Sequence, residues 1–536
     1  MAGLTGATRE RLDPQVRAYI DEVERERDEA NRRVHTLQAQ NEQLREEIVH
    51  ALYKRFARST EKAGEREGTL FAEAEQVAEY ESAQGEAETT TVAEHTRTKR
   101  GRKPIDPDLP RIDIVHDIDE SDKRCGCGHH LVRIGEETCE KVQVIPEQIW
   151  VERHIRPKYA CHECEGSADE DMPAVRVAPA PGSIIPASMV TASLLAFIVV
   201  NKFIDHLPLY RQEKRFERIG ISIARQTMGR WIIEAAKRLK PLIQLFRSAI
   251  REGPLIHMDE TPLQVLGEDG RANTSKSYMW LTLGGPASTP VCLYEYHPSR
   301  GREYPHRLLA DYQGYVQADA WDVYARVCDA EPGITLVGCW AHARRKFHDA
   351  AKASKKAGAA QQALAHIRAL YRIEKELRAK NLDEATFVSR RRELAKPKLE
   401  QFHAWLTEKG ETVLPSSLLG KAVSYTLSQW ERLVRYLDLA ELTPDNNAAE
   451  NAIRPFCLGR RNWLFSGSPK GAEASCTMYS LIQTSKLNGF DPFAYLHYVF
   501  TRVPQITDEN EWRELLPQNL DADTVNTAYE PLRVTG

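Results

Sequence analysis

The sequence has few cysteines, no long apolar run and little net charge. Its ten cysteines are sparse for 536 residues, and four of them fall in two close pairs. This pattern favours a metal site in a reducing compartment over a disulfide framework. The longest apolar run, residues 192–200, is too short to span a bilayer, and residues 1–14 lack the apolar core of a secretory signal. We therefore expect a cytoplasmic protein that makes no membrane contact.

The formal net charge of −4 does not by itself indicate a nucleic-acid binder. Any contact with DNA must come from local basic patches, because bulk charge supplies no attraction to phosphates. A chain of 536 residues is expected to fold into more than one domain and has ample material for a sizeable core.

Residues 1–60 carry apolar residues at heptad spacing. Arg27 and Asn41 interrupt this seam, and a single Asn at such a position is a known device for fixing register and a two-stranded state. The pattern predicts a coiled-coil dimerisation helix, and the alternative is one long helix folded back on its own protein. The seam consists of Val16, Ile20, Val23, Ala30, Val34, Leu37, Leu44, Ile48 and Ala51.

Residues 61–110 form a linker that is first acidic and then basic. The first part is rich in Glu, Ala, Gly and Thr, which predicts a solvated segment. The second part contains Arg100, Arg102 and Lys103 around a glycine, similar to the AT-hook-like arms that lie in A·T-rich minor grooves. The alternative is a basic linker that contacts phosphates without sequence preference.

Two cysteine pairs, Cys125 with Cys127 and Cys161 with Cys164, lie in residues 111–170. Four thiolates suit a closed tetrahedral Zn²⁺ site. The strand-like segments between the pairs predict a small zinc ribbon whose stability depends on the metal. The other interpretation is four free thiols. Since the first pair has only one intervening residue, a histidine could replace one cysteine, and the candidates are His129, His130 and His162.

Residues 171–245 have a helical pattern, with a glycine turn at residues 218–222 before a further helix. The early polar residues of that helix include Arg225 and Arg230. This arrangement resembles a helix-turn-helix, in which the second helix enters the major groove of DNA. The alternative is a three-helix bundle that only supports the core.

Three widely separated acids are the candidate catalytic residues. Asp259 and Asp319 each end a short strand-like run, and Glu450 lies in a helix-like segment with Asn446 and Asn447 as candidate caps. Carboxylates that converge at one end of a sheet repel each other unless cations neutralise them. Two Mg²⁺ or Mn²⁺ ions bound there could clamp the attacking and leaving oxygens of a phosphoryl transfer. Each acid could instead cap a turn, and three neighbours remain alternative ligands: Glu260, Asp322 and Asp445.

Five segments of the chain stand out as motifs, in this order: Met258–Thr261, Gln317–Asp319, Gly338–Phe347, Asp445–Pro455 and Arg461–Gly467. Together they resemble the transposases of the insertion-sequence-66 family. The resemblance covers nearly the whole chain and implies a DDE transposase with a ribonuclease-H-like catalytic core, a zinc-binding segment and small accessory proteins encoded alongside. It also implies basic positions near the DNA ends, at Arg454, Arg460 and Arg461.

The expected fold class is a multidomain α+β and α/β protein. A ribonuclease-H-like core is expected over residues 246–500 and a polar tail over residues 501–536. Because 131 residues separate Asp319 from Glu450, an all-helical insertion is expected at residues 346–442. His342, Arg344 and Arg345 follow the last expected strand, so they should face the acids and contact DNA phosphates or stabilise the charge that develops at phosphorus. A solvated helix face is the alternative for Arg345, and a structural role is the alternative for His342.

These features together predict a metal-dependent DNA transposase that cleaves the ends of an insertion sequence and transfers the freed strand. The expected partners are the terminal inverted repeats and target DNA, in a homodimer or higher oligomer located on the nucleoid when DNA is bound. The main alternative is a zinc-containing, non-catalytic DNA-binding or architectural protein. A ribonuclease or junction nuclease is less well supported, because such enzymes do not need a dimerisation coil or appended DNA-reading modules.

Overall fold

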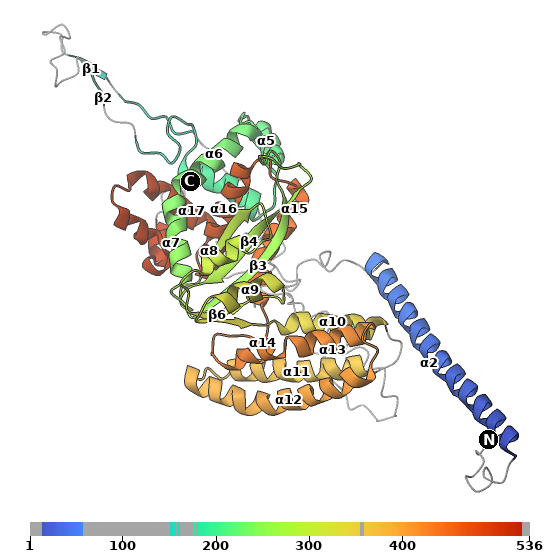
Figure 1. Ribbon diagram of the computed structural model, residues 1–536. Coiled ribbons are helices and arrows are strands. Elements are labelled where there is room, and N and C mark those ends of the chain that lie inside the picture. Colours follow the sequence, from blue (N-terminus) through green and yellow to red (C-terminus); the bar gives the residue numbers. More distant parts are fainter. Residues whose placement is uncertain are drawn as a thin grey trace, which may run out of the picture. The chain divides into compact units, whose positions relative to one another are not determined.

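The computed structural model describes residues 13–56, 149, 151–156, 158–160, 175–177, 181–353 and 358–527 (Figure 1). The chain divides into two units, one of residues 1–67 with 181–536 and one of residues 68–180. In the second unit a short antiparallel pair is described, β1 (Lys158–Ala160) with β2 (Val175–Val177). The predicted zinc ligands and basic arm lie outside the described residues: Cys125, Cys127, Cys161, Cys164, Arg100, Arg102 and Lys103.

The N-terminal heptad segment forms a single helix, α2 (Pro14–Phe56), of 43 residues. At 1.5 Å per residue this helix is about 65 Å long. Most residues of the heptad seam are exposed along this helix. A coiled coil would bury them against a second helix. Dimerisation itself stays a prediction. The exposed seam residues are Val16, Val23, Val34, Leu37, Leu44 and Ile48.

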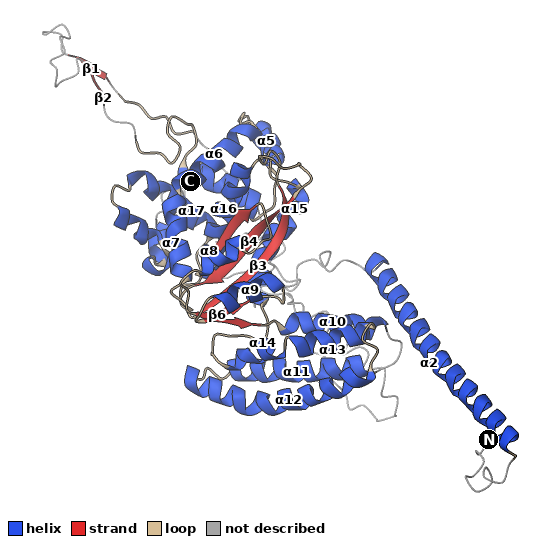
Figure 2. Ribbon diagram, in the orientation of Figure 1, coloured by secondary structure: helices blue, strands red, loops and turns tan. Residues whose placement is uncertain are grey.

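A five-stranded mixed sheet forms the centre of the first unit (Figure 2). Its spatial order is β5-β4-β3-β6-β7, so β3, the first strand of this sheet along the chain, is also its middle strand. Neighbours β3, β4 and β5 are antiparallel, whereas β6 and β7 run parallel to β3. The strands are β3 (Leu255–Gln264), β4 (Lys276–Gly284), β5 (Val291–His297), β6 (Gly314–Gln317) and β7 (Ile334–Val337).

The burial pattern changes along β3. From Leu255 to Met258 every residue is buried, as in a strand covered on both faces. From Thr261 to Gln264 burial alternates, as in a strand with one face toward solvent. Asp259 and Glu260 lie between these two stretches. The middle strand is therefore covered on both faces up to Met258, and one of its faces is open to solvent after the first predicted acid, Asp259.

Helices that precede the strands along the chain and helices that follow them share one hydrophobic core with the sheet. Helix α16 lies along β5, where the buried hydroxyls of Thr484 and Ser480 accept hydrogen bonds from the N–H groups of Cys292 and Tyr294, at 3.0 and 2.8 Å. The outer edge of β5 is thus paired and closed to further strands. The helices are α4 (Ala192–Phe203), α5 (Leu209–Arg218), α6 (Arg225–Arg238), α7 (Lys240–Ile250), α8 (Glu303–Leu309), α9 (Asp322–Ala330), α15 (Asn447–Trp463), α16 (Pro469–Leu487) and α17 (Pro492–Arg502).

A group of helices between β7 and α15 forms a second hydrophobic core (Figures 1 and 2). Its first helix begins at Trp340, six residues before the predicted insertion, because Trp340 and Ala343 already pack into this second core. Helix α10 therefore belongs to the insertion, although it begins only three residues after β7. The helices are α10 (Trp340–Ala353), α11 (Ala359–Arg378), α12 (Glu384–Thr412), α13 (Leu418–Ser428) and α14 (Trp430–Val434).

The segment predicted as a polar tail is partly folded. Short helical turns follow α17, and a last helix, α18, spans Ala522–Thr527. Leu515, Leu516 and Val525 are buried in the core shared with the sheet. The sequence did not predict that these three residues are buried, because they stand among polar residues and form no periodic apolar stripe. Among the helices described, none combines the length and apolar character that a bilayer crossing requires.

One buried arginine holds the insertion to the chain that returns toward α15. The Arg391 side chain is 0% exposed. It donates to the carbonyls of Tyr436, Leu439 and Leu442, at 2.6, 2.8 and 3.0 Å, and to Glu374 Oε1 at 2.8 Å. A buried charge is stable only when such partners compensate its lost hydration.

We predict that Arg391→Met lowers the free energy of unfolding of the insertion by about 3–5 kcal/mol. It leaves the buried carbonyls of Tyr436 and Leu439 without this donor and leaves Glu374 with only the partly exposed Arg378 as a partner. Urea denaturation followed by tryptophan fluorescence measures this loss. Arg390→Met is the matched control, because Arg390 is exposed and makes only an i,i+3 pair with Glu393, a pair worth at most about 0.5 kcal/mol. Equal losses in the two variants would contradict the role assigned to Arg391.

Candidate active site

Two of the predicted acids lie at the same level at one end of the parallel strands. The pairing of β3 with β6 runs as far as His257 opposite Gln317. Asp259 and Asp319 each follow two residues later. Each carboxylate accepts a hydrogen bond of 2.9 Å from a nearby backbone N–H. The strand register therefore sets these two acids side by side.

The third predicted acid arrives from a different element. Glu450 lies in the first turn of α15, and α15 packs along β3. An acid near a helix N-terminus also interacts favourably with the helix dipole. The three acids interact electrostatically, since the charges of Glu450 and Asp319 both act on Asp259. Among the described residues, however, their carboxylate oxygens do not form one group within 4.8 Å; the group that does consists of Cys339, His342 and Glu450.

A single buried side chain, Asn446, connects the start of α15 to β3. Its Nδ2 donates to the carbonyl of Met258 at 2.9 Å, and its Oδ1 lies 2.9 Å from Nδ1 of His257. Its backbone N–H donates to Sγ of Cys339 at 3.3 Å. Asn446 therefore fastens the helix that carries Glu450 to the two residues that precede Asp259.

The same contacts define the protonation of His257. Since Nδ2 of Asn446 is taken by a carbonyl, Oδ1 must face His257, and His257 Nδ1 must carry the proton. Complete burial lowers the pKa of His257, so its imidazole is neutral. The sequence suggested Asn446 as a helix cap. It does occupy the N-cap position, but its side chain bonds β3 and makes no capping hydrogen bond.

The electrostatics of the site suit a cation. Burial, together with the charges of Glu260, Glu450 and Asp319, raises the pKa of Asp259 to about 8. Burial also raises the pKa of Glu450, against the lowering effect of Arg345. Glu450 Oε1 is buried without a hydrogen-bond partner among the residues described. A set of oxygen donors that repel one another, with one donor atom unsatisfied, fits a hard divalent cation.

The three neighbouring acids that remained as alternatives are already engaged elsewhere. Glu260 accepts hydrogen bonds from Arg300, through Nε at 2.8 Å, and from the hydroxyl of Tyr324. Asp322 is exposed and forms an ion pair with Arg326. Asp445 Oδ1 accepts the N–H of Asn447 at 3.1 Å. These contacts favour Asp259, Asp319 and Glu450 as the metal-binding set.

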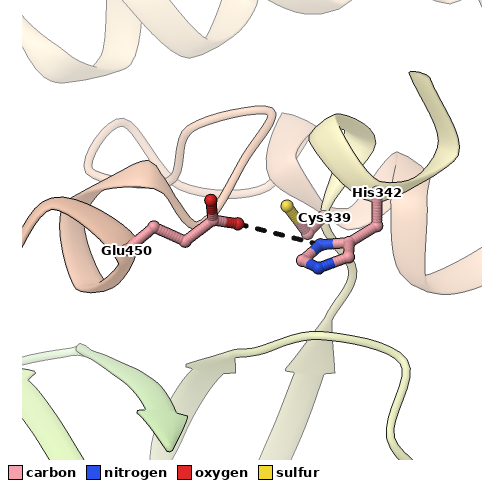
Figure 3. A group of neighbouring side chains, drawn as sticks. All are labelled: Cys339, His342 and Glu450. Carbon is pink, nitrogen blue, oxygen red and sulfur yellow. Dashed lines mark ion pairs between the residues drawn. The ribbon is translucent and has the colours of Figure 1, made fainter. Parts of the chain in front are cut away.

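Two residues at the start of α10 complete the surroundings of Glu450 (Figure 3). Ligand atoms of Cys339, His342 and Glu450 all lie within 4.8 Å of one another. His342 was expected to contact DNA, and its Nδ1 lies 3.9 Å from Glu450 Oε1. Cys339 was not expected in the site. Its position two residues after β7, level with the two aspartates, was the available signal, because β6 and β7 end in register.

The predicted basic residues differ in their surroundings. Arg345 Nη2 lies 3.8 Å from Glu450 Oε2 and forms an ion pair with this acid. Arg460 donates to Thr261 Oγ1 at 3.1 Å and to the carbonyl of Pro262, which ties α15 to β3. Arg344 is half-buried on α10. The remaining predicted DNA contacts are exposed on helices: Arg225, Arg230, Arg454 and Arg461.

The pair α5 and α6 has features of the predicted helix-turn-helix. The turn contains Gly220 at φ 83°, a backbone conformation that glycine adopts without strain. Glu213 of α5 accepts the N–H of Arg225 at 3.1 Å and so satisfies one free donor at the start of α6. DNA contact by this pair stays a prediction.

The profile of the transposase IS66 family matches residues 187–474, which is more than half of the chain and includes all three acids. The chain belongs to the IS66 transposase family. The C-terminal element of IS66 matches residues 480–518, and the zinc-finger domain of IS66 transposases matches residues 122–165. A profile described as transposase C of IS166 homeodomain matches residues 43–114. The resemblance noted in the sequence is confirmed.

Relatives within this family include two uncharacterized proteins of Sinorhizobium fredii. The protein y4jD is 35% identical over 434 residues, which cover 78% of this chain and 82% of the relative. The protein y4qI is 32% identical over 442 residues, which cover 80% of each chain. The IS66 zinc-finger match spans all four predicted cysteines, and a zinc-finger domain is accordingly part of the architecture.

We predict that Asn446→Leu lowers the free energy of unfolding by about 3 kcal/mol, because it leaves His257 Nδ1 and the Met258 carbonyl buried without partners. Guanidinium denaturation of the full chain measures the change. The control is Asn451→Leu, which alters the same residue type at an exposed position of the same helix and should change stability by less than about 0.5 kcal/mol. Similar costs at both positions would rule out the link described here.

Proposed function

We propose that this chain is a DDE transposase that cleaves DNA at the ends of its insertion sequence and joins the freed ends to target DNA. Asp259, Asp319 and Glu450 are the proposed catalytic residues and ligands of two divalent cations, Mg²⁺ or Mn²⁺. The observation that carries the proposal is the common level of the two strand aspartates, together with the Asn446 contacts that bring Glu450 to the same edge.

The sheet supports a ribonuclease-H-like interpretation of the core. Three antiparallel strands come first along the chain, and two parallel strands follow with helices between them. This order is the one expected of the ribonuclease-H-like mixed sheet. In such an arrangement the two strand acids and the acid on a later helix share one edge, as proposed for this chain.

The chemistry follows from the donor set. Divalent ions, when bound, would activate water and stabilise the charge that develops at phosphorus. The three carboxylates would hold and orient these ions, and the exposed guanidinium of Arg345 beside Glu450 could contact a DNA phosphate. Water would cleave the bond to the 3′ oxygen at the element end. The released 3′-OH would then attack target DNA in line and displace a 3′ oxygen there.

This scheme needs no covalent link between protein and DNA, so no Ser or Tyr nucleophile is assigned. DNA would be held by modules outside the acids. We assign this role to the exposed Arg225 and Arg230 of α6 and to the exposed Arg454 and Arg461 of α15. The coiled coil would supply a homodimer, which could present two such sites to two DNA ends.

The first test replaces each acid by its amide. Asp259→Asn, Asp319→Asn and Glu450→Gln should each reduce Mg²⁺-dependent cleavage of element ends at least about 100-fold while leaving DNA binding unchanged, because the amides remove the negative charges that bind cations. Nicked and joined products are resolved on denaturing gels, and binding is measured by gel shift.

Asp322→Asn is the control for that test, because Asp322 is an exposed acid near the site that pairs with Arg326. It should retain cleavage. Cleavage by Asp259→Asn would exclude the proposed ligand set. Wild-type protein that binds ends but yields no nicked or joined products with Mg²⁺ or Mn²⁺ would favour the architectural alternative.

The second test concerns zinc. We propose that Cys125, Cys127, Cys161 and Cys164 bind one structural Zn²⁺, so the purified chain should contain about one zinc per molecule. Cys161→Ser should lower that content severalfold and destabilise this segment. Elemental analysis by mass spectrometry measures the zinc. Cys457→Ser is the control and should keep the metal, and an equal zinc loss in both variants would argue against this site.

A further inference from the structure

Two buried polar atoms face each other beside the proposed catalytic acids. His342 Nδ1 and Glu450 Oε1 lie 3.9 Å apart, and neither has a hydrogen-bond partner in the part of the chain that the structure describes (Figure 3). Buried polar atoms are nearly always satisfied in folded proteins. A pair that lacks partners on both sides of the same gap indicates a group that lies between them.

The gap is not closed by a hydrogen bond between the two residues, and the dashed line in Figure 3 marks an ion pair only if His342 is protonated. A separation of 3.9 Å exceeds hydrogen-bond length. In the neutral tautomer that carries its proton on Nε2, the Nδ1 of His342 has a free lone pair. Such an imidazole and the facing carboxylate can both offer a lone pair to a cation.

Cys339 belongs to the same cluster but is not available as a ligand. Its Sγ already accepts the backbone N–H of Asn446. A soft sulfur ligand also suits Zn²⁺ or Cu⁺ rather than Mg²⁺ or Mn²⁺, which prefer harder ligands. Its role in the cluster is to hold the start of α15.

We propose that His342, through Nδ1, is a further ligand of the divalent ion held by Glu450. This inference rests on the proposed function and extends its ligand set from three carboxylates to three carboxylates and one imidazole. Two ligand atoms at about 2.1 Å from one octahedral ion lie about 3.0 Å apart when adjacent and about 4.2 Å apart when opposite. The observed 3.9 Å lies between these values, so small side-chain shifts would let both atoms bind one ion.

The elements on either side of the gap are held in place independently of any ion. Trp340, two residues before His342, is fully buried. Its backbone N–H donates to the carbonyl of Pro444 at 2.9 Å, and its Nε1 donates to the carbonyl of Leu433 at 2.8 Å. Glu450 is held by the Asn446 contacts. The backbone on both sides of the gap is thus held in place, so only the two side chains remain to be ordered when an ion binds.

A nitrogen ligand also affects the choice of metal. Mg²⁺ prefers oxygen ligands alone, whereas first-row transition ions accept imidazole nitrogen. The proposed set should therefore bind Mn²⁺ more tightly than Mg²⁺. Loss of the imidazole should weaken Mn²⁺ binding more than Mg²⁺ binding, a difference that a purely structural role for His342 would not produce.

The test uses Mn²⁺ as the probe on the zinc-loaded full chain without DNA. Electron spin-echo envelope modulation detects ¹⁴N nuclei bonded to Mn²⁺, and titration gives the affinity. Wild-type protein should show the nitrogen signal. His342→Gln should lose it and bind Mn²⁺ about 10-fold more weakly, with a smaller change for Mg²⁺. His348→Gln is the matched control, because His348 is another half-buried histidine of α10, and it should keep both signal and affinity.

Two results would overturn the inference in different ways. If Mn²⁺ binding is lost in Asp259→Asn but the nitrogen signal is missing from wild type or survives in His342→Gln, the acids bind metal without His342. In that case a water molecule satisfies the two atoms, and the proposed function stands. If Asp259→Asn leaves Mn²⁺ binding unchanged, the carboxylate site is wrong, and both the proposed function and this inference fail.

Discussion

The structure depends on holding together carboxylates that repel each other at one edge of a sheet. Two of them come from parallel strands, so backbone pairing alone sets their spacing. The third returns after 131 residues, and no strand pairing can place it. Asn446 supplies the missing constraint through two side-chain contacts with β3. Because the Asn446 side chain is buried and its contacts satisfy buried groups, moving α15 away would leave several polar atoms unpaired.

The surrounding charges are arranged to limit that repulsion without removing it. Glu260, the nearest extra acid, is neutralised by Arg300 and Tyr324, and Arg300 also stacks over the ring of Trp321 at 4.0 Å. Arg345 lies close to Glu450 but is partly exposed. Asp259, Asp319 and Glu450 remain as the carboxylates available to a cation. A buried cluster of this kind destabilises the fold unless a cation is bound, which is a common cost of a preformed metal site.

The helical insertion is built as a separate core that meets the site at both ends. Helix α10 carries His342 near the acids and packs Trp340 and Phe347 into the insertion. At the other end, Arg391 binds the carbonyls of the chain that leads back toward Glu450. The insertion therefore contributes to the geometry of the site although it supplies none of the three acids. The contacts at its two ends hold the first residues of α10 and the chain that leads into α15.

The sequence alone determined the family, the order of the segments and the three candidate acids. The long motifs around Asp259, Asp319 and Glu450 are stretches of neighbouring residues, so they can be read directly from the sequence. The heptad spacing of apolar residues likewise indicates the helix α2, because it matches helix periodicity. Only the tertiary structure decided which neighbouring acids are engaged, since the partners of Glu260 lie 40 and 64 residues away. It alone showed that Asn446 bonds β3 rather than capping α15, and that Cys339 lies beside His342 and Glu450. Contacts between residues so distant along the chain leave no periodic or local pattern, because they arise from how the sheet, the insertion and α15 pack together.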